Sequence, residues 1–193
     1  DADWLKALFK TAPTSQGDIS FSGGSQGTSY YASIGYFDQE GMAREPANFK
    51  RYSGRLNFES RINEWLKVGA NLSGAIANRR SADYFGKYYM GSGTFGVLTM
   101  PRYYNPFDVN GDLADVYYMY GATRPSMTEP YFAKMRPFSS ESHQANVNGF
   151  AQITPIKGLT LKAQAGVDIT NTRTSSKRMP NNPYDSTPLG ERR

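Results

Sequence analysis

An oxygen-rich cluster is the first place where this 193-residue chain could bind a ligand. It contains Asp108, Asn110 and Asp112, whose carboxylate and amide oxygens are the ligand types that calcium prefers. The cluster lacks the length of an EF-hand loop and its terminal bidentate glutamate. Because Asp, Asn and Gly also build ordinary turns, a calcium site and a simple turn both stay open as interpretations. The sequence predicts no cofactor.

Tyrosine rings between residues 80 and 142 form a second candidate group. A tyrosine combines a flat apolar ring with a polar hydroxyl, so an exposed one can stack on a sugar ring or anchor a protein partner. The same rings could instead pack together and fold this segment onto itself. The candidates for contact with a substrate or a partner are Tyr84, Tyr88, Tyr89, Tyr103, Tyr104, Tyr117 and Tyr118.

Catalytic chemistry finds little support in the residue types. His143 lies two positions from Glu141, which could form an acid–base pair or could be an ordinary exposed histidine. It is the single histidine, so a multi-histidine metal site is excluded. There are no cysteines, which excludes disulfides, zinc–thiolate sites and thiol nucleophiles. No serine lies in a nucleophile-elbow context. The chain is therefore not predicted to be an enzyme.

A repeated charged pattern marks one face of the strand predicted for residues 51–62. Its members are Arg51, Arg55, Glu59 and Arg61, and apolar side chains such as Leu56 alternate with them. Successive side chains of a strand point to opposite faces, so one wall is charged and the other apolar. Charged side chains suit the water-filled interior of an outer-membrane barrel better than a packed core. These four residues are therefore candidates for a lumen-facing wall.

The elements that must position these residues follow from the same alternation. A short helix is predicted at residues 3–10, with Asp3 as its N-cap. Six strands are predicted, and Phe150 falls on the polar side of the fifth. By segment, the prediction is a short helix and loop at 1–14, four strands within 18–79, a long extracellular loop at 80–142, two strands within 143–172, and a loop at 173–193.

The connections between these strands alternate in length: they are short at 24–27, 63–65 and 155–158 and long at 38–48 and 80–142. Outer-membrane barrels have short periplasmic turns and longer extracellular loops, whereas a Greek-key sandwich has no reason to alternate so regularly. The proposed lipid face carries no charge across its middle, and Lys50 lies only at its outer end. The sequence thus predicts an all-β protein, an antiparallel transmembrane β-barrel segment.

Composition supports a membrane barrel rather than an ordinary soluble core. Only 38% of the residues are hydrophobic, while there are 14 tyrosines and 19 glycines, a bias found in outer-membrane barrels. No run approaches the roughly 18 apolar residues of a transmembrane helix. The basic residues behind the net charge of +5 are scattered, so nucleic-acid binding is not predicted. The start at Asp1 and the lack of a visible signal peptide suggest a mature or excised piece.

A collinear set of short motifs covers residues 3–80 densely and the rest more sparsely. The motifs are DWL (3–5), FKTAP (9–13), ISFSGG (19–24), YYASIGYFDQEG (30–41), FKRYS (49–53), WLKVGANLS (65–73) and YNPFD (104–108), with Asn57 and Gly111. Together they resemble the SusC/RagA family of TonB-linked outer-membrane receptors. No single motif would be specific.

The resemblance implies a bacterial outer-membrane barrel of about 22 strands with an N-terminal plug. It also implies a SusD-like surface lipoprotein as a lid, energy supplied through TonB, and import of oligosaccharides or peptides. The plug and most strands are absent from this chain, so the four charged residues of residues 51–61 would face the lumen or the plug of a larger protein. The alternative from another class is a secreted or surface-exposed β-sandwich that binds carbohydrate without transporting it.

Overall fold

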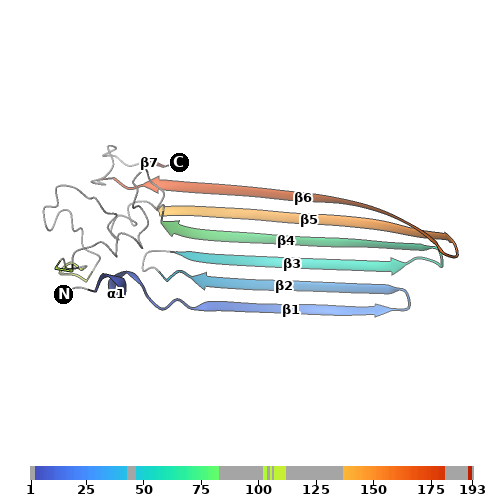
Figure 1. Cartoon of the computed structure of the whole chain (residues 1–193), viewed down its shortest axis with the longest axis horizontal. Helices are drawn as coiled ribbons and strands as arrows, with labels where there is room; N and C mark the ends of the chain where they lie inside the picture. Colours follow the sequence, from blue (N-terminus) through green and yellow to red (C-terminus); the bar gives the residue numbers. More distant parts are fainter. Residues whose placement is uncertain are drawn as a thin grey trace.

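The computed structural model describes residues 3–42, 47–82, 102–103, 105, 107–111, 137–180 and 191–192. These residues form one antiparallel sheet in which each strand pairs with its neighbours in sequence (Figure 1). The strands are β1 (Thr14–Ser25), β2 (Thr28–Glu40), β3 (Asn48–Arg61), β4 (Leu66–Ala82), β5 (Pro137–Ile156), β6 (Leu159–Arg178) and the two-residue β7 (Glu191–Arg192). The only described helix is α1 (Trp4–Leu8). The all-β prediction is confirmed.

The long strands extend beyond the predicted limits. β1 begins at Thr14 rather than at residue 18, β4 ends at Ala82 rather than at 79, β5 begins at Pro137 rather than at 143, and β6 ends at Arg178 rather than at 172. The predicted loops 80–142 and 173–193 were therefore wrong at these borders. The apolar alternation stops there, but backbone pairing continues through polar pairs such as Glu141 opposite Arg173. The hydropathy pattern marks the apolar band, whereas the hydrogen-bonded ladder is longer.

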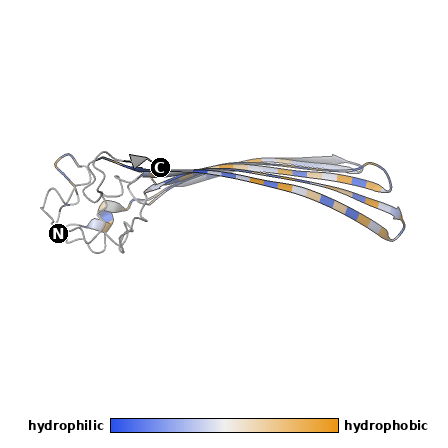
Figure 2. Cartoon of the chain, turned by 90° about the horizontal axis from the view of Figure 1, so that it is seen from above, coloured by the Kyte–Doolittle hydropathy of each residue, from blue (hydrophilic) through white to orange (hydrophobic). Residues whose placement is uncertain are grey.

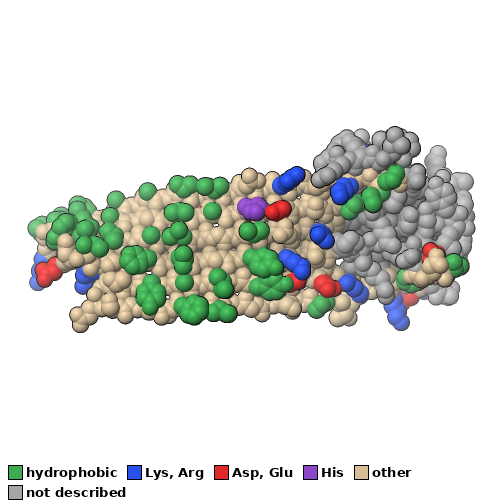
Figure 3. Space-filling view, turned by 180° about the vertical axis from the view of Figure 1, so that it is seen from behind, with side chains coloured by type: hydrophobic (Ala, Val, Ile, Leu, Met, Phe, Trp, Pro, Cys, Tyr) green, Lys and Arg blue, Asp and Glu red, His purple; other side chains and the backbone are tan. Residues whose placement is uncertain are grey.

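The register brings the apolar positions of all six long strands onto one face, called here the apolar face. Hydrophobic and hydrophilic residues alternate along the strands nearest the viewer in Figure 2, and the apolar side chains spread over the face shown in Figure 3. The central row consists of Phe21, Ala32, Leu56, Leu72, Val147 and Val167, each opposite the next. Phe21 is 66% exposed and Leu56 is 55% exposed. No described segment covers this face.

Three tight connections join β1 to β2, β3 to β4 and β5 to β6 at one end of the sheet (Figure 1). Gly27 and Gly158 have φ values of +91° and +93°, which glycine adopts without a steric penalty. In the connection between β3 and β4, Asn63 Oδ1 accepts hydrogen bonds from the amides of Trp65 (3.0 Å) and Leu66 (2.8 Å). The strand ends that the longer connections join, Glu40 with Asn48 and Ala82 with Pro137, lie at the opposite end of the sheet (Figure 1), which matches the predicted alternation.

Helix α1 begins as predicted but ends early. The amide of Lys6 donates to Asp3 Oδ1 at 3.0 Å, so Asp3 is the N-cap. The helix stops at Leu8 because the chain then becomes extended, and the Lys10 amide bonds to the Met42 carbonyl at 2.7 Å. Trp4 and Ala7 are the only buried hydrophobic side chains among the described residues. No helix in the described ranges has the length and apolar character needed to cross a bilayer.

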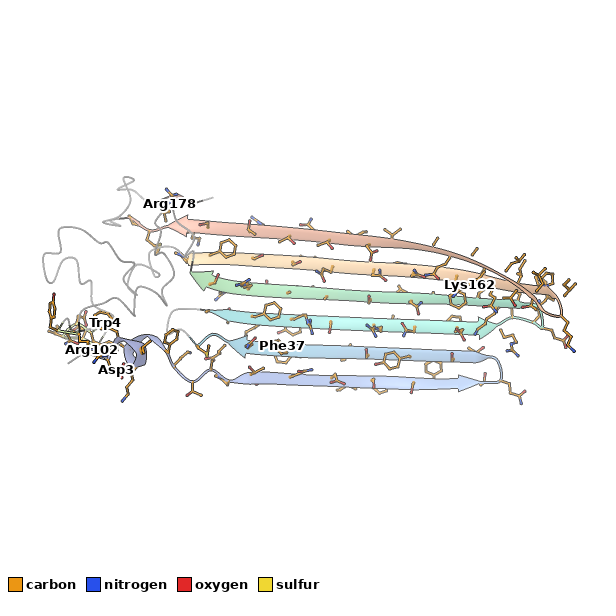
Figure 4. All side chains as sticks on the ribbon, in the orientation of Figure 1. Asp3, Trp4, Phe37, Arg102, Lys162 and Arg178 are labelled. Carbon is orange, nitrogen blue, oxygen red and sulfur yellow. The ribbon has the colours of Figure 1, made fainter. Side chains whose placement is uncertain are left out.

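Phe150, which interrupts the predicted alternation, lies directly opposite Gly69 on the side of the sheet away from the apolar face. Its ring lies where a side chain on Gly69 would be, and a Cβ there would overlap the ring. Lys162 Nζ lies 4.5 Å from the centroid of the same ring (Figure 4), within the range of a cation–π contact. A glycine thus accommodates a large ring on a mostly polar wall.

We expect Gly69→Ala to destabilise the full-length protein by about 1–3 kcal/mol, because the added methyl group displaces the Phe150 ring. The check is denaturant unfolding in detergent. Gly54→Ala is the matched control, because its Cβ would have its nearest neighbour, the Ser33 carbonyl oxygen, at 3.8 Å. An equal loss of stability in both variants would contradict the role of Phe150.

Candidate functional site

The charged residues predicted for one wall do lie on one face of β3. Arg51, Arg55, Glu59 and Arg61 alternate with the apolar-face residues of that strand. We call this side of the sheet the polar face. Its side chains come from all six long strands, because residues directly opposite in an antiparallel pair share a face. The polar face is therefore a continuous wall on which hydrogen-bonding and charged groups from distant parts of the sequence meet.

Two phenylalanines and an arginine lie near the end of the polar face where the long connections lie. The guanidinium carbon of Arg51 is 6.0 Å from the ring centroid of Phe37, its direct partner on β2 (Figure 4). The rings of Phe37 and Phe49 meet edge to face with centroids 5.9 Å apart. This arrangement offers aromatic surface and a positive charge side by side, the combination that can hold a flat or hydroxyl-bearing ligand.

Arg55 lines a polar depression of about 480 Å³ near the middle of the wall. Asp168 and Asn146 contribute from the neighbouring strands, and the Asn146 amide donates to the Asp168 carboxylate. Hydroxyl groups also line it, those of Ser33, Ser53, Ser73 and Thr170. The depression therefore combines one positive charge, one negative charge and several neutral donors and acceptors.

Three asparagines continue the wall below this depression. Asn57 on β3 lies opposite Asn71 on β4, which lies opposite Asn148 on β5. Asn148 Oδ1 is buried and has no hydrogen-bond partner within the described part of the chain. A buried acceptor without a partner costs free energy. This amide ladder therefore has capacity for a hydrogen bond from a group that packs against the wall.

The tight-turn end of the polar face carries an ion pair and the contact between Lys162 and Phe150 already described. Glu59 Oε1 and Lys67 Nζ are 2.6 Å apart. Both side chains are more than a third exposed, so this pair adds little stability. Arg61 lies directly opposite Lys67 and has the same charge. This end of the wall thus carries an excess of positive charge.

Sequence reasoning selected only the four β3 residues of this wall. It did not select Phe37, Phe49, Asn146, Lys162 or Asp168 as site residues. The alternation of polar and apolar residues could have identified them, because within each strand these residues alternate with apolar ones in the same way as Arg55 does. What the sequence did not supply was the register that places Arg55 and Asp168 around one depression.

The other predicted site residues are only partly within the described ranges. Tyr103 is 76% exposed. The remaining tyrosine candidates lie outside the described residues; they are Tyr84, Tyr88, Tyr89, Tyr104, Tyr117 and Tyr118. Their role in substrate or partner contact stays a prediction.

The weak calcium candidate forms a turn where it is described. Asp108 Oδ1 accepts from the Asn110 amide at 2.8 Å, and the Asp108 carbonyl accepts from the Gly111 amide at 3.1 Å. Gly111 has a φ of +82°. Asp112 lies outside the described residues. Within the described ranges no group of three His, Cys, Asp or Glu side chains could hold a metal ion.

His143 and Glu141 do pair, with His143 Nε2 2.7 Å from Glu141 Oε1. Glu141 lies in β5 rather than in the predicted loop, and both residues are on the apolar face near its polar border. Both side chains are about half exposed. No candidate nucleophile is recorded in contact with this pair among the described residues. The polar face, not this pair, is the stronger candidate for ligand contact.

Comparison with known proteins gives three curated relatives, each named a TonB-dependent receptor. TonB-dependent receptor P26 of Formosa agariphila is 31% identical over 111 residues, which is 55% of this chain and 11% of the receptor. TonB-dependent receptor P3 of the same organism is 27% identical over 176 residues, covering 90% and 17% respectively. TonB-dependent receptor SusC of Bacteroides thetaiotaomicron is 30% identical over 84 residues, covering 43% and 8%.

No family model matches the chain. The chain spans less than a fifth of the length of these three receptors. The alignment with the second relative nevertheless covers nearly the whole chain. The likeness is therefore not confined to the densest motifs near the N-terminus.

Proposed function

We propose, on the premise that this chain belongs to the SusC-like TonB-dependent receptors, that its six long strands form part of the wall of an outer-membrane nutrient importer. In this proposal the apolar face contacts lipid and the polar face lines the lumen. The strands have 12 to 20 residues, and a tilted strand needs roughly 9–11 to cross the hydrocarbon core. The remaining residues of each strand would extend beyond it.

The observation that carries the proposal is the separation of side chains across the sheet. The apolar face has no charged residue across its middle, from the row of Ile34 and Gly54 to the row of Tyr30 and Phe58. A basic residue at the bilayer midplane of a barrel would cost about 2–4 kcal/mol. The polar face carries Arg55 and Asp168 at the same level. Such a sheet fits between lipid on one side and water on the other.

The β-sandwich alternative finds no support in the described residues. A sandwich buries its apolar face against a second sheet, but the described strands form a single sheet. Ile34 and Val167 on its apolar face are 64% and 59% exposed. A carbohydrate-binding sandwich would have to supply the second sheet from other parts of the chain.

The polar face would either contact an internal plug or line the path of the substrate. Its amides, hydroxyls and charged groups suit both, because each can hydrogen-bond a polypeptide or a hydroxyl-rich ligand. TonB and a SusD-like surface lipoprotein are the partners we propose for the whole receptor, with oligosaccharides or peptides as substrates. Support for these partners and substrates comes from the family, not from this segment alone.

The proposal is tested on the full-length protein that contains this chain, extracted from outer membranes in detergent. We expect a compact electrophoretic band that shifts to lower mobility only after boiling, because a closed barrel resists unfolding until heated. Recovery of a soluble protein without such a shift would overturn the proposal.

A further inference from the structure

We propose that the apolar face holds a specific site for a phosphorylated glycolipid of the outer leaflet, with an acyl chain over Gly54 and Gly74 and a phosphate at Asn78. The inference rests on the proposed barrel and goes beyond it. Most lipid-facing barrel surface needs only to be apolar. This face also has a hollow and, next to it, a group of basic side chains.

The hollow is an open depression of about 1020 Å³ on the apolar face. Its floor is low because the row across the sheet passes through Gly54, Gly74 and Ala145. Larger side chains of neighbouring rows, Tyr52 and Ile76 among them, rise beside it. The volume reaches the upper end of small-molecule pockets, which is roughly 300–1,000 Å³. Its lining is overwhelmingly apolar, so it suits a hydrocarbon chain rather than a polar ligand.

The apolar-face residues of β4 change in character along the strand. From the hollow toward the end with the long connections they run Gly74, Ile76, Asn78 and Arg80. A glycolipid beside this column would meet a small floor residue, an apolar side chain, an amide and a cation in that order. This sequence matches an acyl chain that continues into a polar, phosphorylated headgroup.

Basic side chains lie near Asn78, whose direct neighbour on β5 is the acidic Glu141. Lys50 is the direct neighbour of Asn78 on β3, Arg80 lies two residues further along β4, and Arg173 lies two strands away on β6. Diagonal neighbours on adjacent strands are about 7–8 Å apart, within reach of long side chains. A phosphate at Asn78 could therefore contact Lys50 and Arg80 together. In Figure 3 charged side chains on this face lie toward the end with the long connections, beyond the uncharged middle.

The acidic groups near this point already have partners. Asp38 Oδ2 lies 3.0 Å from Lys50 Nζ and accepts from the Tyr36 hydroxyl at 2.8 Å. Glu141, the other neighbour of Asn78, pairs with His143. In the part of the chain that the structure describes, no acidic partner is recorded for Arg80 or Arg173. Arg80 therefore remains available to an anion at the level of the headgroups, whereas Arg173 lies directly opposite Glu141.

The test uses full-length receptor that shows the heat-modifiable band, so that a failed barrel and a failed lipid site are distinguished. Native mass spectrometry in detergent would measure retained lipid after titration with purified lipid A. We expect wild-type protein to retain it and Arg80→Gln to weaken retention roughly tenfold, as expected for a lost hydrogen bond between charged groups. Arg79→Gln is the matched control, because Arg79 lies on the polar face at the same level.

A second variant and a second lipid separate the two parts of the site. Gly74→Leu should fill the hollow and weaken binding of both phosphorylated and dephosphorylated lipid A. Dephosphorylated lipid should bind wild type and Arg80→Gln equally. The proposal is overturned if Arg79→Gln weakens retention as much as Arg80→Gln, or if the phosphate makes no difference. A receptor dimer that excludes the lipid would assign the face to a second copy instead.

Discussion

Leu72→Arg in the full-length protein is expected to prevent assembly of a heat-modifiable barrel in the outer membrane. Leu72 lies in the central row of the apolar face, between Leu56 on β3 and Val147 on β5. An arginine at this depth would cost about 2–4 kcal/mol in lipid. That is a large part of the stability of a typical folded domain, about 5–15 kcal/mol. The expected readout is loss of the compact band and of protein in the outer-membrane fraction.

The matched control is Asn71→Arg, one residue earlier on the opposite face. Asn71 lies in the amide ladder, with Glu59 diagonally across on β3. An arginine there would face water in the proposed barrel, so we expect assembly close to that of wild type. Equal loss of the barrel in both variants would show that the two faces are not in different environments, and the lipid-facing assignment would then be wrong.

Deleting Val147 alone should impair assembly of the barrel at least as much as Leu72→Arg does, because the deletion affects every later residue of the strand. Side chains of a strand alternate with a period of two, so one missing residue moves every later position to the other face. Beyond the deletion, apolar residues such as Ile153 would turn toward the polar face, and polar ones such as Gln152 would turn toward lipid. We expect no heat-modifiable protein in the outer membrane.

Deleting Val147 and Asn148 together is the control for the loss of chain length. A two-residue deletion shifts the pairing but keeps every remaining side chain on its own face. We therefore expect part of the protein to assemble, with lower stability, where the single deletion gives none. If the shorter deletion is tolerated as well as or better than the longer one, side-chain parity does not govern assembly.

The fold could be predicted from the sequence to the extent that alternation is visible. The strand around Leu161 and Val167 has a clean pattern, and its sense and faces were predicted correctly. The end of the same strand was predicted wrongly, because beyond Thr172 the side chains on both faces are polar and their alternation no longer distinguishes the two faces. The ladder continues there through backbone hydrogen bonds, which do not depend on residue type.

The candidate site could be predicted only within single strands. Arg51 and Arg55 share a face because of their spacing, which needs no structure. The meeting of Arg55 with Asp168 requires the register of four consecutive strands, separated by a long connection, and no local pattern contains that information. Phe150 shows the same limit. It breaks the pattern of its own strand and makes sense only beside Gly69 of another.

The pairing of each long strand with its sequence neighbours also determines how the number of strands in this sheet can change during evolution. β1 with β2, β3 with β4, and β5 with β6 are three self-contained hairpins, each closed at the same end of the sheet. Duplicating or losing one whole hairpin would leave the inward and outward faces of every other strand unchanged. In the proposed barrel it would also return both chain ends to their original side of the membrane. In the proposed barrel the hairpin is thus the smallest unit by which this wall can widen or narrow, and the diameter of its pore would evolve in steps of two strands.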